Sequence, residues 1–270
     1  MVRRSQRVEH GSLESMPSTV NHADLRQVYG AGRLARLLWA ARCLVCSEPG
    51  EDGWELCHRC RITLPDNEAP CRRCAIPLAV PTPGAAGADP GFLPDGCDAC
   101  TTAPPPIDLV HAPFLYAPPL DRLLPRFKFH QDLAAGRLLS GLMATRLPPT
   151  RRAGWQSAVL VPVPLHRRRL RSRGYDQGLE LARPLARGLG IPLSARLLQR
   201  TRHTSAQSSL DADERRDNLR DAFSVTAAPP PHVVLVDDVM TTGTTLHAAA
   251  EALLAAGTRR VDAWVCARVP

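Results

Sequence analysis

The 270-residue sequence predicts an α/β protein in which a parallel sheet, covered by helices on both faces, follows a small cysteine-rich domain. Three observations lead to this prediction. Apolar strand-like runs alternate with helical patterns in the second half of the chain, CxxC pairs crowd an earlier stretch, and one apolar strand ends in two adjacent aspartates. Strands that alternate with helices are typical of a parallel sheet.

Composition divides the chain into three parts. Residues 1–38 are polar and almost unpatterned, so we expect a disordered leader and a short helix there. Residues 39–103 hold the cysteine pairs, and residues 104–270 hold the alternating elements. No apolar run approaches the ~20 residues of a membrane span, and the N-terminus lacks the apolar segment of a secretory signal. We therefore expect a cytoplasmic protein without membrane insertion.

The cysteine pairs have the spacing of zinc ligands. Each pair encloses two residues, and the eight cysteines are Cys43, Cys46, Cys57, Cys60, Cys71, Cys74, Cys97 and Cys100. Two thiolates of a CxxC turn bind one side of a tetrahedral zinc ion, and a second pair completes the site. We expect two closed, structural zinc sites, with the pairs combined either in sequence order or interleaved. The ninth cysteine, Cys266, lies in an apolar strand and is expected to be a buried core thiol.

The elements after the cysteines can be assigned in order. An extended run covers 108–117, a helical pattern covers about 120–146, and a strand covers 157–164. A basic loop, a helix through GLELARPLARGLG, the short run LSARLLQRT and a polar loop follow. The chain closes with the strand VVLVDD, a helix over about 244–256 and the strand RRVDAWVCAR. In such a sheet, ligands bind beyond the carboxyl ends of the strands.

The strand VVLVDD delivers two carboxylates to a turn that leads directly into a helix. Unsatisfied backbone N–H groups and the helix dipole favour an anion there, and an acidic side chain can accept hydrogen bonds from vicinal ribose hydroxyls. Phosphate plus diol describes a ribose 5-phosphate, whereas the alternative is an ordinary helix start with threonine caps. The candidate binding residues are Asp237, Asp238, Met240, Thr241, Thr242, Gly243, Thr244 and Thr245.

Basic residues suggest a further anion site. The net charge is +8, and all basic residues are arginine except Lys128, which suggests a site that requires a compact ammonium group. Five arginines fall within residues 166–173, and guanidinium groups suit a diphosphate. A solvated surface or a nucleic-acid patch is the alternative for most of them. Arg173, next to Gly174, is the stronger candidate for the anion-binding loop.

The motif VDDVMTTGTT resembles the 5-phosphoribosyl-1-pyrophosphate (PRPP) signature of type I phosphoribosyltransferases. With CLVC, CHRC, CRRC, CDAC, FKFHQD, VPVPLHRRRLRSRGYDQG and TRHTSAQSSLDADERRDNLRDAF, the chain resembles the ComF family, ComFC-like proteins, over about residues 38–270. The resemblance implies a double zinc ribbon followed by a type I phosphoribosyltransferase fold. It also implies that PRPP binds with Mg²⁺, with Lys128 and Arg173 on the pyrophosphate side.

The resemblance extends to a loop and to partners. Arg202, Thr204 and Gln207 match family positions in a polar loop that could close over the substrate. The family implies a role in uptake of single-stranded DNA during natural transformation, together with a ComFA-type ATPase. Aromatic residues are sparse, and Trp54 is the only obvious candidate for stacking on a strand.

One position departs from a common pattern. Purine phosphoribosyltransferases commonly carry an aspartate base where Thr241 stands, so purine salvage is disfavoured. The alternative to a DNA-uptake protein is a pyrimidine-type or other phosphoribosyltransferase that acts in nucleotide salvage. The acceptor, and whether catalysis occurs at all, stay open at this point.

Overall fold

The computed structural model describes residues 41–78, 96–147, 154–201 and 222–270. The helices are α3 (His58–Ile62), α4 (Asp98–Thr102), α5 (Leu120–Phe129), α6 (Leu133–Thr145), α8 (Arg167–Arg173), α9 (Gln177–Leu189) and α11 (Thr244–Ala255). The strands are β1 (Leu109–His111), β2 (Phe114–Leu115), β3 (Val159–Pro162), β4 (Leu198–Arg200), β5 (Phe223–Val225), β6 (His232–Met240) and β7 (Arg260–Arg268). The leader and short helix expected in residues 1–38 lie outside the described residues.

A parallel sheet forms the centre of the fold. Its strand order is β1-β7-β6-β3, and β2 also pairs with β7, every pairing being parallel. The longest pairing joins β6 and β7, from His232 opposite Arg260 to Met240 opposite Arg268. Because all strands run the same way, their carboxyl ends meet at one edge of the sheet. The parallel sheet predicted from the alternating pattern is confirmed.

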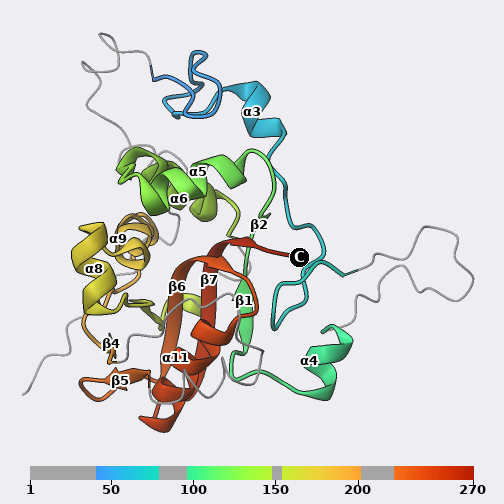
Figure 1. The fold of residues 1–270 in the computed structure, drawn as a ribbon. Coiled ribbons are helices and arrows are strands. Elements are labelled where there is room, and N and C mark those ends of the chain that lie inside the picture. Colours follow the sequence, from blue (N-terminus) through green and yellow to red (C-terminus); the bar gives the residue numbers. More distant parts are fainter. Residues whose placement is uncertain (1–40, 79–95, 148–153, 202–221) are drawn as a thin grey trace, which may run out of the picture.

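Helices cover both faces of this sheet, as predicted. Val234 and Val236 of β6 belong to the core formed with α5, α6 and α9, whereas Val233 and Leu235 belong to the core formed with α11. Successive side chains of a strand point to opposite faces, so the two cores lie on the two sides of the sheet. Figure 1 shows α11 in front of β6 and β7. Burial on both faces explains why the strand is continuously apolar rather than alternating.

The helical pattern over about 120–146 forms two helices rather than one. α5 ends at Phe129, and Gln131 adopts a positive φ of 56°. Asp132 then caps α6, because its side chain accepts a hydrogen bond from the Ala135 N–H at 3.0 Å. Both helices contribute to the same core, so apolar periodicity continues across the break and does not reveal it.

Two further elements differ from the sequence prediction. The arginine-rich stretch expected to be a loop forms α8, which starts after His166 and ends at Gly174 with a φ of 85°. The strand β5 was not predicted, and it pairs antiparallel with β4. β5 has only three residues, which is too short for a period of two to be recognised in the sequence.

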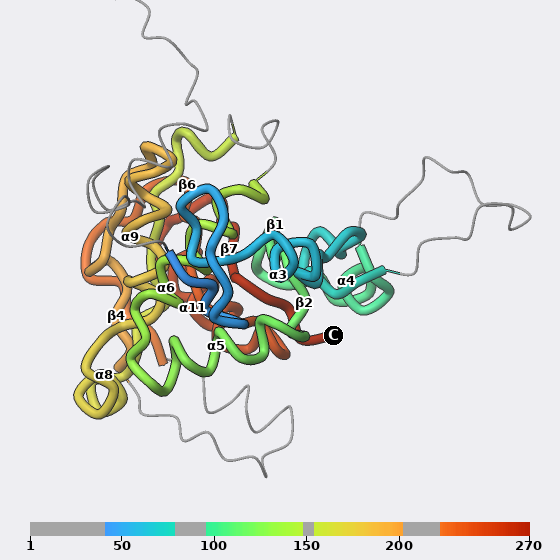
Figure 2. The backbone as a smooth tube through the Cα atoms, turned by 90° about the horizontal axis from the view of Figure 1, so that it is seen from above, coloured from blue at the N-terminus to red at the C-terminus, as the bar shows by residue number. Residues whose placement is uncertain are grey.

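The first cysteine segment packs against α5 and α6 (Figures 1 and 2). The ring of Trp54 lies over Gly141 of α6, where an added Cβ would come within 2.7 Å of the ring atom Cζ3. Arg126 of α5 donates a hydrogen bond to the Leu44 carbonyl. The Trp54 ring is therefore partly buried by this contact, which leaves less of it for stacking on a nucleic-acid strand.

We expect Gly141→Ala to destabilise the protein. Replacing a helical glycine by alanine normally gains up to ~1 kcal/mol, but overpacking against the Trp54 ring costs typically ~1–3 kcal/mol. The two effects leave a net cost of up to ~2 kcal/mol, so the midpoint of thermal unfolding should fall by about 2–4 °C for each kcal/mol lost. Gly154→Ala is the control, because nothing lies within 4 Å of its added methyl group. Equal midpoints for the two variants would contradict the packing of Trp54 on α6.

Candidate functional site

Two acidic side chains stand near the carboxyl end of β6. The Asp237 carboxylate accepts a hydrogen bond from the Asp238 N–H at 2.8 Å, and the Asp238 carboxylate accepts one from the Val239 N–H at 2.9 Å. Each carboxylate is thus held against the backbone of its own strand. The chain leaves the strand at Met240 and enters α11 four residues later.

Charge around the acid pair is only partly balanced. The Lys128 Nζ atom lies 3.1 Å from Asp238 Oδ2 and 3.4 Å from Oδ1. Burial, and then the charge of Asp238, raise the pKa of Asp237 well above its usual range, although Lys128 opposes this shift. One carboxylate is therefore neutralised by an ammonium group, and the other favours a proton. Hydroxyl groups suit such a pair, because they both donate and accept hydrogen bonds.

The turn after β6 has the form expected of an anion site. Gly243 is the N-cap of α11, adopts a positive φ of 80° and leaves the helix start without a side-chain cap. The positive φ favours glycine here, and a Cβ would also lie 2.5 Å from the Met240 Cε atom, so that side chain would have to move. The hydroxyls of Thr242 and Thr244 lie 2.7 Å apart beside it. The first N–H groups of the helix and its dipole therefore remain available to a phosphate.

The structure links the two basic residues selected from the sequence. Arg173 donates a hydrogen bond to the Gln177 side-chain carbonyl, and the Gln177 amide donates to the Lys128 carbonyl at 3.4 Å. The Arg173 guanidinium also lies 5.7 Å from the centre of the Phe129 ring. Lys128 and Arg173 thus belong to one connected group that includes Asp238.

Sequence reasoning missed Gln177 and its neighbours. Asp176 caps α9 by accepting from the Leu179 N–H at 3.0 Å, and it also accepts from the Leu165 N–H at 3.1 Å. A Cβ at Gly178 would lie 3.0 Å from the Val163 and Val236 carbonyl oxygens, so α9 approaches the ends of β3 and β6 closely. The sequence DQG, an N-cap residue followed by an amide and a glycine, could have indicated this helix start and its close approach to the sheet. Arg202, Thr204 and Gln207 lie outside the described residues.

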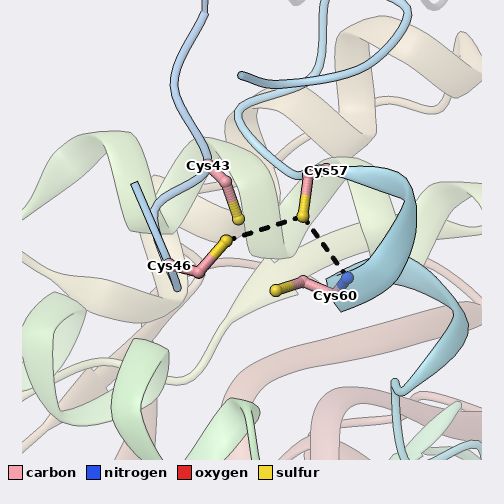
Figure 3. A group of neighbouring side chains, drawn as sticks. All are labelled: Cys43, Cys46, Cys57 and Cys60. Carbon is pink, nitrogen blue, oxygen red and sulfur yellow. Dashed lines mark hydrogen bonds between the residues drawn. The ribbon is translucent and has the colours of Figure 1, made fainter. Parts of the chain in front are cut away.

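The eight paired cysteines form two groups, combined in sequence order. The first group is Cys43, Cys46, Cys57 and Cys60, and the second is Cys71, Cys74, Cys97 and Cys100. In each group all sulfur atoms lie within 4.8 Å of one another, and Figure 3 shows those of the first group directed toward one centre. One sulfur–sulfur distance is 3.6 Å in the first group and 3.7 Å in the second. Zn–S bonds of ~2.3 Å arranged as a tetrahedron separate the sulfurs by about 3.8 Å, so the groups fit zinc.

The surroundings favour a thiolate at one cysteine of each group, whereas burial raises the pKa values of Cys60, Cys74 and Cys100. Burial opposes ionisation of Cys43 and Cys71, but backbone N–H groups that donate to their sulfur atoms lower their pKa values to about 6 and about 7. Zinc ligands must be deprotonated. Because four cysteines complete each group, no position is left for water or substrate, and the sites are structural. Cys266 is fully buried in β7, as predicted.

Within residues 41–78, 96–147, 154–201 and 222–270, no helix combines the length and apolarity needed to cross a bilayer.

Comparison with known proteins identifies the family. The family model of the phosphoribosyl transferase domain matches residues 176–270, and that of the double zinc ribbon domain matches residues 34–101. The chain is 33% identical over 230 residues to "DNA utilization protein YhgH" of Escherichia coli O157:H7, covering 84% of this chain and 96% of that protein. It is 32% identical over 205 residues to "Competence protein F" of Haemophilus influenzae, covering 73% and 90%. The chain belongs to the ComF family. This ComF protein has a type I phosphoribosyltransferase fold preceded by a double zinc ribbon region.

We expect this ComF protein to bind two zinc ions per chain. Cys46→Ser and Cys97→Ser should each lower the zinc content from two ions to one, because each removes a ligand from a different group. Cys266→Ala, which changes a cysteine outside both groups, should retain two ions. Elemental analysis of purified protein at known concentration measures these contents. A single ligand substitution that removes both ions would contradict two independent sites.

Proposed function

We propose that the carboxyl edge of the sheet binds PRPP, or a related ribose 5-phosphate. The observation that carries this proposal is the acid pair directly before a helix start without a side-chain cap. The phosphate of the ligand is placed at residues 241–245, where N–H groups and threonine hydroxyls can donate to its oxygens. The ribose diol would lie at Asp237 and Asp238. Burial favours a proton on Asp237, so this carboxyl group can donate a hydrogen bond to a hydroxyl, whereas the Asp238 carboxylate can accept one.

The basic group beside the acid pair fits the pyrophosphate of PRPP. Lys128 and Arg173 bring two cations to one side of Asp238. PRPP carries Mg²⁺ on its diphosphate, and oxygen atoms of this kind are the ligands that Mg²⁺ prefers. If the protein also catalyses transfer, positioning and charge neutralisation supply the means. Nucleotide salvage by a pyrimidine-type enzyme, unrelated to DNA uptake, is the alternative function of the same pocket.

We further propose that the protein supports uptake of single-stranded DNA, in the cytoplasm and together with a ComFA-type ATPase. The names of its relatives, a DNA utilization protein and a competence protein, support this part. A surface that we call the α8 surface also supports it. This surface consists of Arg167, Arg168, Arg171, Arg173 and Leu170 of α8, with Phe129 at the end of α5.

The α8 surface has the chemistry of a single-strand binding site. Among the residues that the structure describes, no carboxylate forms an ion pair with Arg167, Arg168 or Arg171. Phe129 is 66% exposed, with a guanidinium over its ring. Unpaired arginines attract a phosphate backbone through counterion release, and an exposed aromatic ring stacks with bases. Phe129 is thus a more exposed candidate for stacking than Trp54, the only candidate that the sequence suggested.

Binding of PRPP should depend on the acid pair. We expect calorimetric titration with PRPP and Mg²⁺ to show saturable binding to the zinc-loaded protein. Asp237→Asn/Asp238→Asn should weaken binding at least about 100-fold, because hydrogen bonds that charged carboxylates accept from the diol contribute ~1.5–3 kcal/mol each. Asp108→Asn/Asp121→Asn removes the same number of carboxylates elsewhere and should bind like the wild type.

Three outcomes would test the proposed functions of the pocket. No heat of binding to folded, zinc-loaded wild type would contradict the PRPP proposal. Release of pyrophosphate on adding a pyrimidine base would favour the salvage alternative. Binding of PRPP without release in the presence of any nucleobase would favour a pocket that supports DNA uptake without transferring the ribosyl group.

Single-stranded DNA should bind to the α8 surface. In fluorescence anisotropy with a labelled oligo-dT, we expect Arg167→Ala/Arg168→Ala/Arg171→Ala to reduce the slope of log affinity against log salt by about 2, since each lost phosphate contact contributes ~0.7. Phe129→Ala should cost ~1–3 kcal/mol through lost stacking, with little change of that slope.

The matched control uses arginines on other exposed surfaces. Arg183→Ala/Arg187→Ala/Arg196→Ala removes the same charge from α9 and the segment after it. Equal losses of slope in the two triple variants would contradict a localised site and indicate only a response to net charge. Duplex DNA that binds as tightly as oligo-dT would contradict the stacking role of Phe129.

A further inference from the structure

Arg268 lies where the second cysteine group meets the phosphate turn. It is the last residue of β7, and it is only 8% exposed. Its Nε atom donates to the Cys74 carbonyl at 2.8 Å, and its Nη1 atom donates to the Met240 carbonyl at 3.2 Å. Nη1 also donates to the Val269 carbonyl. One side chain thus joins a zinc-ligand turn to the residue that precedes the turn of the anion site.

The two joined segments are distant in sequence but adjacent in space. Figures 1 and 2 show the carboxyl end of the chain beside the segment between α3 and α4. That segment is also tied to the edge of the sheet, because the Val110 N–H donates to the Arg72 carbonyl at 2.8 Å. The Asn67 amide donates to the Ala75 carbonyl at 2.9 Å and to the Ala112 carbonyl at 3.1 Å.

Because the Arg268 guanidinium is charged and buried, its position depends on the carbonyl groups that accept its hydrogen bonds. Among the described residues, no carboxylate forms an ion pair with Arg268. Three backbone carbonyls therefore satisfy a buried guanidinium. Losing one hydrogen-bond partner of a buried charged group costs more than an ordinary hydrogen bond contributes. Movement of the Cys74 carbonyl should consequently displace the guanidinium from its position at Met240.

Met240 connects Arg268 to the turn at 241–243. Its carbonyl accepts both from Arg268 and from the Val269 N–H at 3.0 Å. Its side chain, 2% exposed, fills the space under Gly243, where a Cβ would lie 2.5 Å from the Met240 Cε atom. The position of the uncapped helix start therefore depends on where Met240 is held.

Zinc in the second cysteine group would fix the turn that carries the Cys74 carbonyl. The Cys97 N–H donates to the Cys71 sulfur at 3.3 Å, and the Cys74 and Cys97 sulfurs lie 3.7 Å apart. Zinc would join the turn that carries the Cys74 carbonyl to the second CxxC pair. The first group has no such connection to the turn at 241–243, since its described contacts run to α5 and α6.

We propose that Arg268 is a positioning residue through which zinc in the second group sets the anion affinity of the phosphate turn. Loss of zinc from the second group weakens phosphate binding, whereas loss from the first group does not. The inference rests on the proposed function, because it takes the turn at 241–245 as the phosphate site. The hydrogen-bond chain from Cys74 to Met240 stands without that assumption.

The first experiment measures the turn without any ligand. We expect Arg268→Met to speed amide hydrogen exchange at residues 241–245 by roughly tenfold in the full-length, zinc-loaded protein, because the turn opens locally more often. Arg126→Met is the matched control. Arg126 also donates to a backbone carbonyl of a cysteine segment, that of Leu44 in the first group. Equal exchange of the turn in both variants would overturn the proposal.

The second experiment leaves Arg268 unchanged, so it does not depend on whether its variant folds. Cys97→Ser and Cys46→Ser each remove one ligand from one group. Titration with ribose 5-phosphate should show roughly five- to tenfold weaker binding in Cys97→Ser and an unchanged affinity in Cys46→Ser. The probe lacks the diphosphate, so it does not test the contact proposed between Lys128 and the diphosphate.

The outcomes separate the two proposals. If zinc-loaded wild type fails to bind ribose 5-phosphate, the proposed function fails, while faster exchange in Arg268→Met and Cys97→Ser still supports the link. If wild type binds and both cysteine variants bind equally well, the proposed function stands and the link is overturned. Equal weakening in both cysteine variants also overturns it, because it indicates a general loss of stability.

Discussion

The pairing of β6 with β7 in the middle of the sheet restricts charged side chains on these strands to positions near the strand ends. Both strands are buried on both faces by α5, α6 and α9 on one side and by α11 on the other. A charged group along their length would lie in the core, where an unpaired charge is costly. The acidic residues of this pair are accordingly found near one end or the other.

The two ends treat their acids differently, and the difference favours the carboxyl end as the ligand site that we propose. At the amino end, Asp262 accepts from Trp155 at 2.7 Å, pairs with Arg260 at 2.9 Å and contacts His232 at 3.1 Å. Burial opposes ionisation of Asp262, yet these three partners hold its pKa below the usual range. At the carboxyl end, Lys128 is the only described cation in ion-pair contact with Asp237 or Asp238, and the pKa of Asp237 is raised. The first arrangement is complete, whereas the second retains capacity for a ligand.

The sequence predicted those features that a local pattern encodes. CxxC spacing indicated the zinc ligands, and VVLVDD followed by a glycine turn indicated the strand, the acids and the helix start. The combination of the cysteine pairs was left open, because spacing alone does not say which turns meet in space. The ion pair of Lys128 with Asp238 spans 110 positions, and the contact of Arg268 with Cys74 spans 194. Such contacts arise from the fold, and no local pattern records them.

The single lysine illustrates how far composition can lead. A lysine in a chain that otherwise uses arginine suggested a site for a compact ammonium group, and the structure places Lys128 against both oxygens of Asp238. An arginine would bind the same carboxylate through two parallel hydrogen bonds, and its planar fork would hold the pair in one geometry. A lysine holds the carboxylate as a point charge on a flexible stem, and its side chain is 35% exposed. Moving such a cation from Asp238 to an incoming diphosphate would cost less free energy than separating an arginine from the same carboxylate. The residue type therefore suits the exchange of partners that the proposed binding of a diphosphate requires.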